Sequence, residues 1–105
     1  LEAQTRALNS LTRFRKIADE FSVSKIFATA TSAIRNAANG LDLVQMIKDT
    51  TDIDVKIISG MEEAAYIHQG VKRALDLTEG TSLIMDIGGG SIEFIVVKDG
   101  EVMWM

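Results

Sequence analysis

The spacing of apolar residues predicts helices that alternate with strands, followed by a run of strands alone. Apolar side chains recur every three or four positions over the first twenty residues, which is the period of an amphipathic helix. Short apolar runs bounded by turn residues indicate strands. The expected elements are helices at about 2–21, 42–50 and 59–77, and strands at about 25–30, 55–58, 82–87, 91–97 and 101–105.

This order of elements predicts an α/β fold. Strands joined by helical crossovers are parallel, whereas three consecutive strands form an antiparallel meander. The change from alternating helices and strands to consecutive strands predicts a domain boundary near residue 78. Capping boxes are expected at two helix starts, one pairing Asp42 with Gln45 and one pairing Ser59 with Glu62. The residues expected in the core include Phe14, Phe21, Ile26, Phe27 and Phe94.

A glycine-rich turn joins two of the predicted strands and has an acid on each side. Asp86 ends the first strand, Gly88–Gly90 remove three side chains, Ser91 adds a hydroxyl, and Glu93 lies on the following strand. Backbone N–H groups without side chains around them can approach an anion. The pattern therefore predicts a phosphate-binding hairpin, with a simple tight turn as the alternative.

The segment after the glycines distinguishes this turn from other phosphate loops. Walker and dinucleotide-binding loops open a helix, but here a β-branched strand follows, and Asp99-Gly100 predicts a hairpin turn beyond it. A phosphate loop between antiparallel strands resembles that of the sugar kinase, chaperone ATPase and actin superfamily.

Two charged residues outside the loop are candidates for chemistry. Glu63 lies at the border of the apolar face of its helix, beside Gly70, where a carboxylate can be partly desolvated and can orient water. The alternative is that its carboxylate only interacts favourably with the helix dipole at the N-terminus. Glu62, next to it, is explained by its role in the capping box. Arg35, after the first strand, is either a solvated helix charge or a guanidinium that contacts phosphate.

Composition narrows the function classes. The 105 residues suit one small core, and the chain is expected to be cut from a longer protein, since it starts at Leu1 without an initiator Met and stops at Met105 in an unfinished sheet. No apolar run is long enough for a membrane span. The net charge of −4 argues against nucleic acid, and a phosphate site on such a chain needs basic residues or a divalent cation. The absence of cysteine is compatible with a cytoplasmic location.

Three signatures in this order resemble the exopolyphosphatase and guanosine pentaphosphate phosphohydrolase family. The first is Ala30-Thr31 with Arg35, Ala37 and Asn39; the second is Ser59-Gly60 with Glu62-Glu63-Ala64 and Gly70-Val71; the third is Asp86-Ile-Gly-Gly-Gly-Ser-Ile-Glu93. The resemblance implies two actin-like (ribonuclease H-like) lobes, with residues 1–78 as the rear part of the first lobe and 79–105 as the opening strands of the second.

The same resemblance implies hydrolysis of terminal phosphoanhydride bonds in polyphosphate or guanosine pentaphosphate. It makes Glu63 the residue that activates water, assigns Mg²⁺ to Asp86 and Glu93, and implies a homodimer of the full-length protein. The residues that it assigns to substrate phosphate are Arg35, Gly88, Gly89 and Ser91.

Departures from the family pattern keep other interpretations open. Ala65 stands where arginine is usual and Ile92 where threonine is usual. The family's first phosphate loop, an aspartate-glycine-serine hairpin, does not occur here, so we expect little turnover from the chain alone. The alternatives are an actin-like module that senses a phosphate ligand without hydrolysing it, and a kinase of the same superfamily. His68 has no ligand partner at helical spacing and is expected to pack or to lie on the surface.

Overall fold

The computed structural model describes residues 2–105, which form two compact units. The first unit contains the residues up to 30 together with 34–57, and the second contains 31–33 together with 58–105. The mixed α/β composition and the order of elements agree with the sequence prediction. None of the described helices has the length and apolar character needed to cross a membrane.

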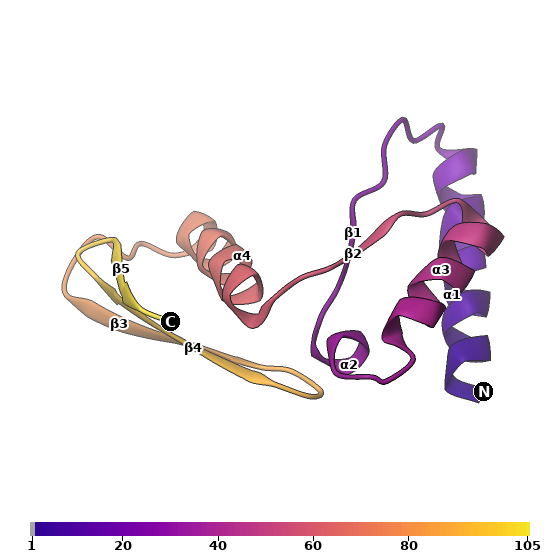
Figure 1. The fold of residues 1–105 in the computed structure, drawn as a ribbon. Coiled ribbons are helices and arrows are strands. Elements are labelled where there is room, and N and C mark those ends of the chain that lie inside the picture. Colours follow the sequence, from indigo (N-terminus) through magenta and orange to yellow (C-terminus); the bar gives the residue numbers. More distant parts are fainter. Residues whose placement is uncertain (1) are drawn as a thin grey trace. The chain divides into compact units, whose positions relative to one another are not determined.

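The first unit is built from two long helices and a parallel pair of strands (Figure 1). Helix α1 (Glu2–Glu20) packs along α3 (Gly40–Thr51), and β1 (Ala28–Ala30) pairs in parallel with β2 (Val55–Ile57). A single turn of helix, α2 (Ser32–Arg35), follows β1 and was not predicted. Both strands are shorter than the apolar runs that indicated them. The buried residues of this unit include Ala30, Ile47 and Ile53.

The start of α3 corrects one sequence prediction. The helix begins at Gly40, with Asn39 as its N-cap and no side-chain cap, so the capping box predicted from Asp42 and Gln45 is wrong. A Cβ on Gly40 would lie 2.2 Å from the carbonyl oxygen of Ile34. The helix therefore starts where only a glycine allows this close approach of two backbone segments.

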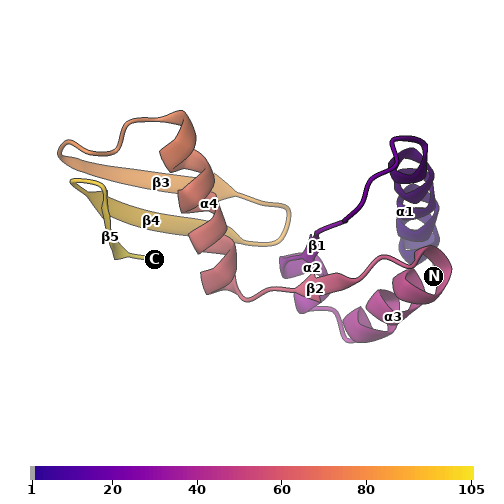
Figure 2. The ribbon, with the colours of Figure 1, turned by 90° about the horizontal axis from the view of Figure 1, so that it is seen from above.

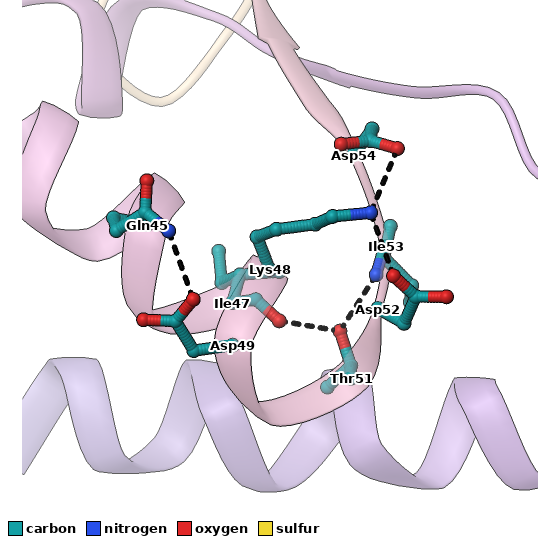
Figure 3. A network of polar contacts seen from close by, with 8 residues as sticks. All are labelled: Gln45, Ile47, Lys48, Asp49, Thr51, Asp52, Ile53 and Asp54. Carbon is teal, nitrogen blue, oxygen red and sulfur yellow. Dashed lines mark hydrogen bonds and ion pairs between the residues drawn. The ribbon is translucent and has the colours of Figure 1, made fainter.

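A lysine joins the end of α3 to the strand that follows it (Figure 3). Lys48 Nζ lies 2.6 Å from Asp52 Oδ1 and 3.0 Å from Asp54 Oδ2. The hydrogen bond to Asp52 is the main reason why the pKa of Lys48 is raised, and the same bond lowers the pKa of Asp52. Thr51 Oγ1 donates to the carbonyl of Ile47 at 2.7 Å and so caps the last turn from within.

The second unit is a helix on a three-stranded sheet (Figure 2). Helix α4 (Gly60–Ala74) crosses one face of an antiparallel meander of β3 (Thr81–Ile87), β4 (Ile92–Lys98) and β5 (Glu101–Trp104). Successive residues of a strand point to opposite faces, and the buried side chains of β4 are Glu93, Ile95 and Val97. These three side chains consequently share the face that packs against α4.

Local signals predicted the start of α4 and the turn between β4 and β5. The Ser59–Glu62 capping box is confirmed, with Ser59 N–H to Glu62 Oε2 at 2.9 Å and Glu62 N–H to Ser59 Oγ at 3.1 Å. The Asp99-Gly100 turn is confirmed by positive φ angles of 47° and 84°. The helix ends at Ala74, before the predicted end.

The predicted aromatic core is wrong for the described chain. The exposed fractions are 60% for Phe14, 78% for Phe21, 83% for Phe27 and 41% for Phe94. Phe94 lies between Glu93 and Ile95 on β4 and therefore points to the sheet face opposite α4. The ammonium of Lys25 lies over the ring of Phe27, 4.8 Å from the ring centre. The boundary expected near residue 78 concerns lobes of a longer protein and stays a prediction.

Candidate functional site

The glycine turn leaves a run of amides without acceptors. Gly88 N–H donates to Ser91 O at 3.0 Å and closes the hairpin, but the return bond from Ser91 N–H to Gly88 O does not form. The amides of Gly89 and Gly90 also donate to no residue in the described range 2–105. Three consecutive N–H groups are thus available to an anion, which is the arrangement that phosphate loops use.

The space around the glycines differs from one to the next. A Cβ on Gly90 would lie 3.1 Å from Ser32 Oγ, so Gly90 is packed against another segment. A Cβ on Gly89 would meet nothing within 4 Å, and φ of Gly89 lies outside the left-handed region. Packing and backbone conformation therefore do not require a glycine at position 89, and the open space there is accessible to a ligand.

Two acids face each other at the base of the turn. Asp86 on β3 is the register partner of Glu93 on β4, and directly opposed residues of an antiparallel pair project to the same face. Asp86 is exposed, whereas Glu93 is only 8% exposed. Glu93 Oε2 is buried and has no hydrogen-bond partner among the described residues. A buried carboxylate oxygen without a partner is costly, so it needs a physical reason.

A cavity of about 400 Å³ connects Glu93 with the start of α4. Its lining residues are Ser59, Gly60, Met61, Ala64, Ile92, Glu93, Phe94, Trp104 and Met105. The first residues of α4 carry the partial positive charge of a helix N-terminus, which favours a nearby carboxylate. The second and third sequence signatures consequently meet in this cavity, since Ala64 and Glu93 both line it although they are 29 residues apart in the sequence.

Glu63 lies in the first turn of α4 and is half-buried, as the helical spacing predicted. Its N–H donates to Ser59 O at 2.9 Å, which fixes its backbone at the helix start. The next residue, Ala64, lines the cavity. Arg35 is the last residue of α2 and is half-buried. It belongs to the first compact unit, so its position relative to the glycine turn stays a prediction.

Comparison with known proteins identifies the family. The model of the Ppx/GppA phosphatase family matches residues 1–105. The chain belongs to the Ppx/GppA phosphatase family. The resemblance inferred from the three signatures is thereby confirmed.

Relatives of the Ppx/GppA chain have longer sequences. A crystal structure of an exopolyphosphatase from Cytophaga hutchinsonii is 46% identical with a TM-score of 0.94, covering 98% of this chain and 33% of that one. A bifunctional 3-dehydroquinate synthase/phosphatase from Fusobacterium nucleatum is 38% identical over 89% of this chain and 14% of its own length. Exopolyphosphatase 1 from Mycobacterium leprae is 30% identical over 87% of this chain and 27% of its own length. The chain therefore spans a third or less of the length of these relatives.

The acid pair of this Ppx/GppA chain fits a divalent cation. No group of three or more His, Asp or Glu side chains that could hold a metal lies within residues 2–105. Mg²⁺ in phosphate sites is commonly held by one or two carboxylates together with water and substrate phosphate. Asp86 and Glu93 provide two carboxylates on one sheet face, and the unpartnered Oε2 of Glu93 is an oxygen ligand of the required kind.

Sequence reasoning assigned no role to Ser32. Its hydroxyl donates to the carbonyl of Gly90 at 2.9 Å, and its side chain is buried. A serine at the first position of a short helix usually indicates a cap, so no local signal reveals a bond to a residue 58 positions away. His68 is half-buried as expected, and its Nε2 atom is buried without a hydrogen-bond partner in the described structure.

Proposed function

We propose that the full-length protein containing this chain hydrolyses the terminal phosphoanhydride bonds of inorganic polyphosphate. The observation that carries the proposal is that one compact unit contains both hydrogen-bond donors for phosphate and carboxylates for a cation. Three amides without acceptors, at Gly89–Ser91, lie in the turn between the two residues of an acid pair, and one carboxylate oxygen of that pair is buried and unsatisfied. Phosphate oxygens can accept hydrogen bonds from the amides, and a cation can bind the carboxylates.

The chemistry follows from the charges that develop during phosphoryl transfer. A water oxygen forms a bond to the terminal phosphorus while the bridging P–O bond breaks, and negative charge spreads over the phosphate oxygens. Backbone N–H groups at Gly89 and Ser91 bind these oxygens in the substrate and in the transition state alike. The carboxylate of Glu63 orients the water and accepts its proton. The shortened polyphosphate leaves with the bridging oxygen, and orthophosphate is the other product.

A cation completes the proposed site. Asp86 and Glu93 would hold Mg²⁺, which neutralises charge on the phosphate oxygens when it is bound. We assign Arg35 to substrate phosphate because a guanidinium can bind phosphate through two parallel hydrogen bonds. The lobes assigned to residues 1–78 and 79–105 and the homodimer of the full-length protein belong to the same proposal.

The names of relatives support polyphosphate as the substrate. Two of the similar proteins reported above are named exopolyphosphatases, and the third is named a phosphatase. Guanosine pentaphosphate presents the same terminal phosphoanhydride chemistry, and the family name includes GppA. It is the second substrate to test.

The test is Mg²⁺-dependent release of phosphate from long-chain polyphosphate by the full-length protein and its Glu63→Gln variant. We expect release by the wild type and a loss of at least about a hundredfold in the variant, in the range for a general base. The matched control is Glu62→Gln, which removes the adjacent carboxylate. Glu62 is a partner in the capping box, so this control should lower stability and retain turnover per folded molecule. Full turnover in Glu63→Gln would exclude the assigned role.

The sensing alternative is tested in the same assay. A wild-type protein that binds tripolyphosphate but releases phosphate from neither polyphosphate nor guanosine pentaphosphate would support a ligand-sensing module. Transfer of phosphate to an added acceptor rather than to water would support a kinase.

A further inference from the structure

Ser32 makes a tertiary contact that bears directly on the glycine turn. Its Oγ donates to Gly90 O at 2.9 Å, and the Ser32 side chain is 5% exposed. Residues 31–33 belong to the same compact unit as the turn. The bond therefore joins a residue near the start of the first sequence signature to the middle of the third.

Peptide geometry turns this bond into a constraint on the neighbouring amide. The peptide unit between Gly90 and Ser91 is planar and trans, so its C=O and N–H groups point in opposite directions. When Ser32 holds Gly90 O on one side, Ser91 N–H is directed to the other side. Ser91 N–H is also one of the amides that donate to no described residue.

The hairpin lacks the return bond that would otherwise fix the orientation of the Gly90–Ser91 peptide. A closed two-residue hairpin commonly has a second bond, here from Ser91 N–H to Gly88 O, and that bond does not form. The hairpin alone therefore does not fix the orientation of the Gly90–Ser91 peptide. The hydroxyl of Ser32 supplies the missing anchor, and it does so from the side opposite to the amide.

We propose that Ser32 is a positioning residue that aims the Ser91 amide at the substrate phosphate by holding the Gly90 carbonyl. This inference rests on the proposed function for the identity of the ligand, but the orientation of the amide does not depend on turnover. It also gives Gly90 a specific role. A Cβ at position 90 would lie 3.1 Å from Ser32 Oγ and 3.7 Å from Ser32 Cβ, so only a glycine leaves the bond undisturbed.

The steric contact makes a double-mutant cycle the sharpest test. Ser32→Ala removes the donor, and Gly90→Ala displaces it from the other side. Removal of the hydroxyl also removes the 3.1 Å conflict, since the remaining Cβ would be at an ordinary contact distance. Gly90→Ala should therefore have a smaller effect in the Ser32→Ala background than in the wild type, as expected for residues in contact.

Kinetics on the full-length protein provide the first readout. Each single variant should lower kcat/KM for polyphosphate by about tenfold, as expected for one misaligned hydrogen bond to a charged group. The change should appear in KM with kcat within about twofold, because the amide contacts phosphate in the ground state and the transition state alike. The matched control is Ser82→Ala, which removes a half-buried hydroxyl from β3 in the same unit. It should leave KM unchanged.

The amide itself provides a readout that is independent of catalysis. In the full-length protein labelled with ¹⁵N-serine, tripolyphosphate should shift the Ser91 amide signal of the wild type and should shift it several-fold less in Ser32→Ala. Unchanged KM and an unchanged Ser91 response in Ser32→Ala would overturn the positioning role, and so would effects of the two variants that simply add. If the wild type binds tripolyphosphate through Ser91 but hydrolyses nothing, the proposed function fails while the positioning role stands.

Discussion

Replacement of Glu93 by glutamine should stabilise the protein in the absence of magnesium. The carboxylate is 8% exposed, and its Oε2 atom lies buried without a partner in the described chain. An unsatisfied buried polar atom costs about 1–3 kcal/mol, and a charged one costs more. Glutamine keeps the shape and removes the charge. We therefore expect the free energy of unfolding to rise by about 1–2 kcal/mol.

The assay is thermal and urea unfolding of the 105-residue chain with and without Mg²⁺. For a domain of 60–100 residues, 1 kcal/mol corresponds to a shift of about 4–8 °C in Tm, so the expected increase is easily measured. Added Mg²⁺ should raise the Tm of the wild type, because a ligand that binds only the folded state stabilises it. It should have no such effect on Glu93→Gln.

The cross-strand partner gives a matched control. Asp86→Asn removes a carboxylate from the same sheet face, but Asp86 is exposed. Its replacement should leave the Tm without metal nearly unchanged while it abolishes the response to Mg²⁺. A Glu93→Gln variant that is less stable than the wild type without Mg²⁺ would refute the reasoning, because it would mean that the carboxylate is already satisfied.

Three further predictions concern the same unit. Ser59→Ala removes one half of the capping box and should lower the free energy of unfolding by about 1 kcal/mol in urea denaturation; no change would exclude a contribution of the cap. Gly89→Ala should leave Tm unchanged or slightly higher, because its Cβ meets nothing within 4 Å, while tripolyphosphate affinity measured by calorimetry should fall at least about tenfold; unchanged affinity would place the phosphate elsewhere. Leu83 and Phe94 are 63% and 41% exposed on the sheet face opposite α4, so the chain should self-associate in light scattering and the double serine variant should be monomeric; a wild-type monomer at high concentration would contradict this.

Local sequence signals predicted the elements whose causes are local. The long first helix follows from its apolar period, and the start of α4 follows from the reciprocal bonds of Ser59 and Glu62. The turn at Asp99-Gly100 follows from the positive φ angles that such turns require. Each of these features depends on residues no more than a few positions apart, so their sequence signatures suffice.

Features that depend on tertiary contacts were missed for physical reasons. The true start of α3 depends on the approach of Gly40 to the Ile34 carbonyl, which no capping pattern describes. Burial of aromatic residues depends on which elements cover a face, and the face of β4 that carries Phe94 is not the one that α4 covers. The bond from Ser32 to Gly90 joins residues 58 positions apart and has no local signature.

The candidate site combines predictable residues with unpredictable geometry. The residue types and spacing at positions 86–93 indicated a phosphate loop with an acid on each side. They did not show that Glu93 is buried while its partner Asp86 is exposed, because both occupy similar positions in the pattern. The asymmetry arises from the position of α4, whose first residues line the same cavity as Glu93.

The unsatisfied groups of this unit have complementary chemistry. The amides of Gly89–Ser91 are donors without acceptors, and Glu93 Oε2 is an acceptor without a donor, yet both lie within five residues of one another in the sequence. They do not bond to each other in the structure. The buried oxygen of Glu93 stays unsatisfied only at a cost in stability, and such costs are typical of functional sites. A phosphate group and a divalent cation bound together would supply an acceptor for the amides and a positive charge for the carboxylate. We therefore expect tripolyphosphate and Mg²⁺ to bind cooperatively, each raising the affinity for the other.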